Sequence, residues 1–216
     1  MKEHYFSPQH YEQTAQKMYQ RILPFRSRRG FSFEPECSAL LVLDMQHYFL
    51  DRSSHAYVPS AGTIIPNIQR LITAYSDHEY PLFFTKHTNN TDNAGLMAGW
   101  WRELITADSP ASEIIPDFNT SVGVVLQKSQ YDAFYKTVLA ELLQEKSINQ
   151  IVICGVMTHL CCETTARSAF MQGFDVFFTI DGTATYNQEH HMATLVNLSH
   201  GFVTAVLTNE ILDTME

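Results

Sequence analysis

The sequence predicts an α/β protein of three layers, in which helices cover both faces of a six-stranded, mainly parallel sheet. Two observations lead to this prediction. Short apolar runs alternate along the chain with longer stretches whose apolar residues recur at helical spacing. The run at 150–154 is apolar and rich in β-branched residues, which is typical of a parallel strand buried on both faces. Strands separated by helices in this way form parallel βαβ units.

The predicted elements follow in chain order. An amphipathic stretch at 8–23 predicts an extra N-terminal helix, and a basic linker runs from Arg26 to Arg29. We therefore expect two parts, an N-terminal helix with its linker at 1–30 and one domain at 31–216. The longest irregular region, 88–120, contains the pair Trp100-Trp101 and is expected to form a lid or an interface. Strands are expected at 38–43, 81–85, 122–126, 150–154, 174–180 and 202–207, and helices at 64–76, 131–146, 159–171 and 189–199.

Composition excludes several kinds of partner. The 216 residues carry a net charge of −9, which argues against nucleic acid or an anionic membrane surface. No apolar run approaches the ~20 residues needed to span a bilayer. The first residues lack the apolar core of a signal peptide, so we expect a cytoplasmic protein. The four cysteines do not suggest a disulfide framework and show no zinc-finger spacing. The expected partner is a small-molecule substrate, without a cofactor.

Three chemically active residues lie just beyond predicted strand ends. Asp44 follows the first strand, Lys128 the third and Cys161 the fourth, and ligands of parallel sheets bind at that edge. Gly155 interrupts the strand before Cys161, and Thr158 is a suitable N-cap for the next helix. Cys161 would then occupy the third helical position, where unpaired N–H groups and the helix dipole favour an anion. The sequence therefore predicts a depressed pKa for this thiol.

These three residue types form a chemical set. A cysteine nucleophile needs a base, and Asp44 could take its proton. The ammonium of Lys128 would offset the repulsion between a carboxylate and a thiolate. In the alternative interpretation, Cys161 is a small buried hydrophobe, Asp44 ends a strand and Lys128 is a solvated charge. Only their joint placement at the strand ends favours the chemical interpretation.

The same residues carry a family resemblance. The segment Leu41-Val42-Leu43-Asp44-Met45-Gln46-His47-Tyr48-Phe49, then Lys128, then Gly155-Val156-Met157-Thr158-His159-Leu160-Cys161 resemble the signatures of the isochorismatase-like cysteine hydrolases. This superfamily includes nicotinamidases, N-carbamoylsarcosine amidases and isochorismatases. The resemblance covers roughly residues 33–210, and three motifs in the right order are far more specific than any one of them.

The resemblance implies a role for each residue. In the amidase branch Asp44 would be the base, Lys128 its partner and Cys161 the nucleophile. A cis peptide is implied between Val156 and Met157, and the backbone N–H groups of Met157 and Cys161 would form an oxyanion hole. Homo-oligomerisation is also expected, from the family and from the apolar face of the N-terminal helix. Substrate contacts are assigned to His87, Trp100, Tyr131 and His159.

The chain departs from two branches of the family. Nicotinamidases carry an Asp-x-His and a distant His as metal ligands near the second strand, whereas this chain offers only His87 there. We therefore expect no metal site, and nicotinamide is a less favoured substrate. The chain otherwise resembles isochorismatases in sequence, but isochorismatases have glycine where this chain has Cys161.

Three functions consequently remain open. The first is a cysteine hydrolase that cleaves a small amide, carbamoyl or related C–N substrate through a thioester. The second is a vinyl-ether hydrolase of the isochorismatase type, with Asp44 as the acid and no covalent step. The third is a catalytically silent binding or scaffold protein that keeps the fold.

Overall fold

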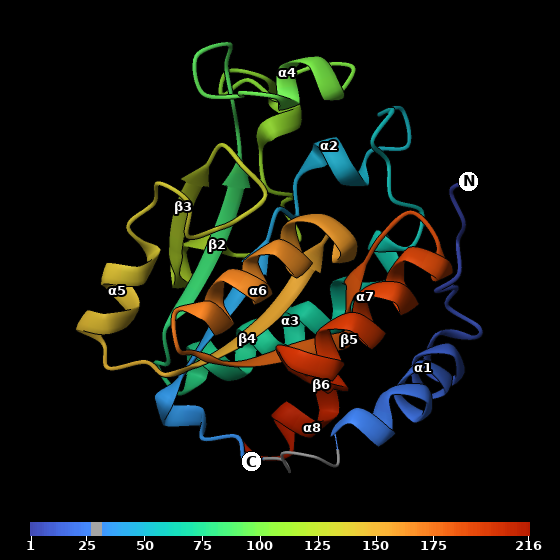
Figure 1. The fold of residues 1–216 in the computed structure, drawn as a ribbon, viewed down its shortest axis with the longest axis vertical. Helices are drawn as coiled ribbons and strands as arrows, with labels where there is room; N and C mark the ends of the chain where they lie inside the picture. Colours follow the sequence, from blue (N-terminus) through green and yellow to red (C-terminus); the bar gives the residue numbers. More distant parts are fainter. Residues whose placement is uncertain (27–31) are drawn as a thin grey trace.

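The computed structural model describes residues 1–26 and 32–216 and has the predicted α/β architecture (Figure 1). Six strands form one sheet in the order β3-β2-β1-β4-β5-β6, and all five pairings are parallel. The strands are β1 (Ser38–Leu43), β2 (Leu82–His87), β3 (Val124–Lys128), β4 (Gln150–Val156), β5 (Asp175–Ala184) and β6 (Thr204–Val206).

Helices connect these strands. The α-helices are α1 (Tyr11–Arg26), α2 (His47–Leu50), α3 (Ala61–Asp77), α4 (Met97–Trp100), α5 (Leu139–Glu145), α6 (Glu163–Met171), α7 (Gln188–Gly201) and α8 (Thr208–Leu212). The described residues also form the short 3-10 turns η1 (Pro35–Cys37), η2 (Pro110–Ser112) and η3 (Thr120–Val122), and the π turn η4 (Thr158–Cys162) precedes α6. In the described part of the chain, no helix combines the length and the apolar character needed to cross a membrane.

The helices lie in two layers around the sheet (Figure 1). Helix α3 packs along β1, β4 and β5 on one face, while α6 and α7 cover the other face. Every residue of β1 and β4 is buried, as the sequence predicted for strands covered on both faces. The sheet and these helices together hold the apolar core.

The order in which successive strands are added to the sheet reverses between β1 and β4, although all the strands run parallel. Strands β2 and β3 extend from one side of β1, and β5 and β6 extend from the far side of β4. Such a reversal opens a crevice at the carboxyl ends of the two central strands. Gly155 makes their close approach possible, because a Cβ atom there would lie 2.1 Å from the carbonyl oxygen of Leu43. Its φ of +111° also suits glycine alone.

One predicted helix is much shorter than expected. The periodicity predicted a helix over 131–146, but only Leu139–Glu145 is α-helical. Before it, the Asp132 carboxylate accepts a hydrogen bond from the Phe134 N–H at 2.8 Å, and Lys136 has a φ of +54°. Such local side-chain bonds compete with helix formation. Residues 131–138 therefore form a loop, which brings Tyr131 toward the carboxyl end of the sheet.

The N-terminal helix is covered by its own chain. Ala15, Met18 and Ile22 are its buried residues, and α1 packs against α7, β5 and β6. The apolar face that we expected to need a partner subunit is thus already occupied, which removes that argument for oligomerisation. Most of the predicted basic linker and the expected boundary at residues 30 and 31 lie outside the described residues.

Candidate active site

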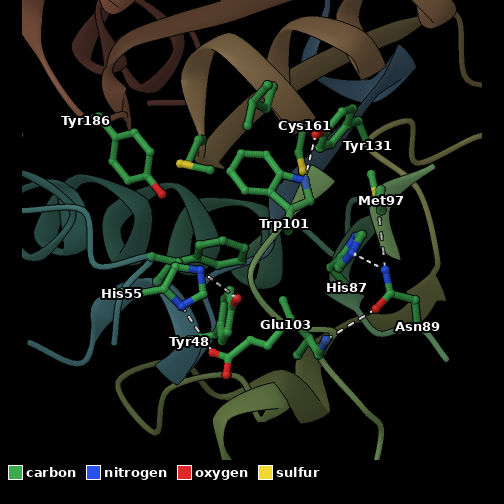
Figure 2. A pocket seen from close by; sticks show the side chains of 15 residues that line it. Tyr48, His55, His87, Asn89, Met97, Trp101, Glu103, Tyr131, Cys161 and Tyr186 are labelled. Carbon is green, nitrogen blue, oxygen red and sulfur yellow. Dashed lines mark hydrogen bonds and ion pairs between the residues drawn. The ribbon is translucent and has the colours of Figure 1, made fainter. Parts of the chain in front are cut away.

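Asp44, Lys128 and Cys161 converge at the carboxyl edge of the sheet. Asp44 directly follows β1, Lys128 ends β3, and Cys161 lies in the π turn after β4. All three side chains are buried. The three residues predicted from the sequence are thus brought into contact by the fold, and Cys161 lines a pocket (Figure 2).

Asp44 is held by its backbone conformation and by β2. Its φ of +51° places it in the left-handed region, which aspartate tolerates better than most residues. The Thr85 hydroxyl donates to Asp44 Oδ1 at 2.6 Å and accepts from the Asp44 N–H at 3.1 Å. Oδ2 lies 2.8 Å from Lys128 Nζ and forms an ion pair with it, but the angles of this contact are not those of a hydrogen bond. This oxygen therefore keeps the capacity to accept a proton.

The Lys128 ammonium links the other two members of the site. In addition to its contact with Asp44, the Lys128 Nζ lies 3.3 Å from Cys161 Sγ. It also donates a hydrogen bond to the Gln130 carbonyl oxygen at 2.9 Å. Burial is the largest single influence and disfavours a charged lysine, but Asp44 and Cys161 together outweigh it and raise the pKa of Lys128. Burial likewise favours a neutral carboxyl, yet Lys128, His87 and Cys161 together outweigh it and lower the pKa of Asp44. The pair is thus ionised at neutral pH.

Cys161 differs from the sequence-based expectation in its protonation state. Burial and the nearby Asp44 carboxylate both raise the pKa of the thiol, and Lys128 only partly opposes them. The predicted depression of this pKa is therefore wrong for the free protein. The predicted cap is wrong as well, because the Thr158 hydroxyl makes no hydrogen bond in the described structure. Cys161 lies in a π turn, in which the Cys162 N–H donates to the Met157 carbonyl at 3.2 Å.

The backbone before Cys161 has an unusual geometry. The peptide between Val156 and Met157 is cis, at the position that the family resemblance implies. No hydrogen bond joins the Met157 N–H to the described residues. Met157 also lines the pocket together with Cys161. The Met157 N–H, which belongs to a residue of the pocket lining, is thus available as a donor to an oxygen atom of a bound molecule.

The pocket above Cys161 is a largely aromatic cavity. The centres of water-sized spheres fit within about 40 Å³ of it, and the atom-free space around them, open solvent included, amounts to about 470 Å³. Its walls come from the segment around α2, the end of β2, the region around α4, the loop after β3 and the connection from β5 to α7 (Figure 2). Among the described residues that line it, Glu103 is the one carboxylate, and none is a lysine or an arginine. The lining residues are Tyr48, Phe49, His55, Ala56, His87, Asn89, Met97, Trp101, Glu103, Ile105, Tyr131, Met157, Leu160, Cys161 and Tyr186.

Two of the four predicted substrate contacts line this pocket. His87 and Tyr131 do so, whereas Trp100 is 79% exposed and is not among the lining residues. The neighbouring Trp101 takes the expected place, and its Nε1 donates to the Tyr131 hydroxyl at 2.9 Å (Figure 2). His159 is not part of the wall, because its Nδ1 bonds to Thr185 and its ring stacks on another histidine 4.4 Å away.

Several wall residues escaped the sequence analysis. Asn89 and Tyr186 follow the ends of β2 and β5, so the strand-end rule that selected the three reactive residues could have found them too. Tyr48 lies in the short helix α2, and His55 lies in the irregular segment before α3. Tyr48 falls within the motif at 41–49, but no sequence pattern marks either side chain as part of the wall.

The comparisons with known proteins show the family. The family model described as Isochorismatase domain matches residues 38–210, and this chain belongs to the isochorismatase family of hydrolases. Nicotinamidase 3 from Arabidopsis thaliana is 40% identical over 174 residues, which cover 78% of this chain and 84% of that protein. Enterobactin synthase component B from Escherichia coli K12 is 31% identical over 191 residues; the match covers 87% of this chain but 66% of that protein.

A solved structure confirms the fold. The cysteine hydrolase from Pseudomonas syringae pv. phaseolicola superposes with a TM-score of 0.82 at 23% sequence identity, and the match covers 86% of this chain and 95% of that one. At this level of identity the likeness concerns the α/β architecture.

The residues around His87 do not fit the metal site of the nicotinamidase branch. Lys128 Nζ lies 3.4 Å from His87 Nδ1, so a cation already faces this nitrogen. The Asn89 amide donates to Nε2 at 3.3 Å. Burial and Lys128 lower the pKa of His87 to about 4, so the ring is neutral near pH 7. Within residues 1–26 and 32–216, no three His, Cys, Asp or Glu side chains are grouped to hold a metal ion.

Proposed function

We propose that this hydrolase cleaves a small neutral amide through a thioester on Cys161, with Asp44 as the base and Lys128 as the cation that holds the site together. One observation carries the proposal: a single buried ammonium lies 2.8 Å from the Asp44 carboxylate and 3.3 Å from the Cys161 sulfur. An inert core cysteine has no need of an ion pair at its sulfur, because burying charges without a function is costly.

The first chemical step begins from a neutral thiol beside a carboxylate. As the sulfur attacks the carbonyl carbon, its proton passes to Asp44, and Lys128 stabilises the negative charge that develops on the sulfur. A C–S bond forms and the carbonyl π electrons move to oxygen. The N–H groups of Met157 and Cys161 are proposed to hold this oxyanion. Transfer of the proton during attack suits a thiol whose pKa is raised in the free protein.

The second step releases the amine. Asp44 returns its proton to the leaving nitrogen, the C–N bond breaks and a thioester remains on Cys161. A water molecule then attacks the thioester, and Asp44 accepts one of its protons. The C–S bond breaks, the sulfur regains a proton from Asp44, and the acid product leaves. The carboxylate therefore acts in turn as base and acid, which requires it to be ionised at the start of the cycle.

The residues that line the pocket favour a flat, uncharged substrate. Aromatic rings form much of the wall, and a dicarboxylate such as isochorismate would find no lysine or arginine among the lining residues. The relationship to Nicotinamidase 3 makes nicotinamide the first compound to test. His87 and Asn89 provide neutral polar groups at the end of β2 that can bond to a ring heteroatom.

A direct assay tests this function. Purified protein is incubated with nicotinamide and with simple aromatic and aliphatic amides, and ammonia is measured by a coupled reductive-amination assay. We expect turnover that Cys161→Ala lowers by a factor of about 10³ or more. Mass spectrometry of an acid-quenched reaction should detect the acyl adduct on the Cys161 peptide. Cys37→Ala is the matched control, because Cys37 lies in η1 at the opposite edge of the sheet and is free.

The same experiment distinguishes the other candidate functions. Cleavage of isochorismate by both the wild type and Cys161→Ala, without ammonia release from any amide, would replace the covalent mechanism with vinyl-ether hydrolysis. Absence of turnover on both substrate classes would favour a binding protein of this fold.

A further inference from the structure

The first residues of the chain lie against two walls of the active-site pocket. The arm, defined as residues 1–6, runs beside the connection from β5 to α7 and beside the segment that precedes α3 (Figure 1). Tyr186 belongs to the first of these segments and His55 to the second, and both line the pocket (Figure 2). The arm thus joins two wall segments that are far apart in the sequence.

Lys2 contacts both wall residues at once. Its Nζ donates a hydrogen bond to the His55 carbonyl oxygen at 2.5 Å. The same ammonium lies 4.5 Å from the centroid of the Tyr186 ring, which is a cation–π distance. One side chain outside the cavity therefore connects two residues whose own side chains face it.

The rest of the arm fixes this arrangement. The Glu3 N–H donates to the Tyr186 carbonyl oxygen at 2.7 Å, and the Glu3 carboxylate accepts from the Gln188 N–H at 3.2 Å. The Tyr5 hydroxyl accepts from the Thr185 N–H at 3.0 Å. Phe6 is fully buried and anchors the arm in the core. Both the backbone and the side chain of the Tyr186 segment are thus set by residues of the arm.

The contact reaches further into the wall through the His55 ring. His55 Nδ1 lies 3.1 Å from Glu103 Oε1, and its Nε2 lies 3.3 Å from the Tyr48 hydroxyl (Figure 2). Glu103 and Tyr48 both line the cavity. A displacement of the His55 backbone would therefore move three wall residues, whereas Asp44 and Lys128 bond to other parts of the chain.

We propose that Lys2 is a positioning residue, and that the arm sets the width of the aromatic pocket and hence the affinity for substrate. This inference rests on the proposed amide hydrolysis for its kinetic readout. Lys2 touches no reacting atom, so its loss should weaken substrate binding and leave the chemical step unchanged. A residue that only stabilised the fold would instead change unfolding and leave the kinetic constants alone.

The test compares three variants of the full chain. Lys2→Met keeps the apolar stem and removes the charge, Lys2→Arg keeps the cation and the donor, and Lys17→Met removes an equal charge from the exposed face of α1. We expect Lys2→Met to raise KM by about two- to fivefold, the range of an exposed cation–π contact, with kcat nearly unchanged. Lys2→Arg and Lys17→Met should resemble the wild type.

Hydrogen exchange provides a readout that needs no substrate. Amide exchange, followed by mass spectrometry, should be faster in Lys2→Met than in Lys17→Met for peptides that cover 53–57 and 185–188. If exchange in these peptides is unchanged, the positioning role is wrong. Faster exchange with an unchanged KM would also overturn it. If the wild type cleaves no amide, the proposed function fails on its own, and exchange alone then decides whether the arm holds the wall.

Discussion

Replacing Lys128 by methionine tests the electrostatic account of the site. The side chains of Lys128 and Asp44 are both 0% exposed, and their charged atoms lie 2.8 Å apart. Removing one partner of a buried ion pair costs about 3–5 kcal/mol, because the other charge stays buried without compensation. For a chain of this length, about 2–4 °C of Tm corresponds to 1 kcal/mol, so we expect a loss of roughly 6–20 °C near pH 8.

The loss in Lys128→Met should depend on pH with a defined sign. In the wild type the pKa of Asp44 is lowered from 3.8, so its contribution to stability is present above that value and is lost as pH falls through the folded-state pKa. The pKa of Lys128 is raised from 10.5, so its contribution is present below that value and is lost as pH rises through the folded-state pKa. Between these limits the contribution of the pair is constant.

Without Lys128, burial is the dominant influence on Asp44 and raises its pKa in the variant. The carboxyl then takes up a proton as pH falls, which removes the buried charge. The deficit of the variant relative to the wild type should therefore be smaller at pH 5 than at pH 8. Urea unfolding followed by circular dichroism at both pH values measures this difference as a free energy of unfolding.

A double-mutant cycle completes the test. Asp44→Asn in the Lys128→Met background removes the second charge, so the double variant should lose less stability than the sum of the two single changes, by about 0.5–3 kcal/mol. Additive losses, or a deficit that is equal at pH 5 and pH 8, would refute the claim that the two groups are ionised partners.

Two further predictions concern the nucleophile and the pocket wall. Asp44→Asn should speed the alkylation of Cys161 by iodoacetamide at pH 8, because it removes a negative charge that raises the pKa of the thiol. Mass spectrometry follows the labelling, and an unchanged or slower rate would contradict that cause. Trp101→Phe should lower kcat/KM by roughly two- to tenfold, because the hydrogen bond to Tyr131 is lost, whereas Trp100→Phe should have little effect. Equal effects of the two changes in steady-state kinetics would show that Trp101 has no special place in the wall.

The sequence by itself was sufficient for the number of strands, their places along the chain and the three reactive residues. Buried parallel strands leave a strong local signal, since residues such as those of 150–154 must be apolar on both faces. The topology of βαβ units then requires Asp44, Lys128 and Cys161 to lie at one edge of the sheet. This inference needs only chain order and strand direction, and neither depends on how side chains pack.

Local signals were insufficient where two neighbouring residues look alike. Trp100 and Trp101 lie at the end of a short helix in an irregular region, so no periodicity indicates which ring faces inward. Residues 131–138 have helical spacing, but the Asp132 carboxylate bonds to the backbone and forms a loop instead. In both cases the outcome depends on contacts that the spacing of apolar residues does not record.

The protonation state of Cys161 was decided by tertiary structure alone. The position of Cys161 near the start of a helix predicted a lowered pKa from two local causes, the helix dipole and the unpaired N–H groups. In the folded protein the thiol is 4% exposed and lies beside Asp44, which comes from a strand more than a hundred residues earlier in the chain. Desolvation and the field of a nearby charge depend on distances in space, and these distances exist only once β1, β3 and β4 have come together.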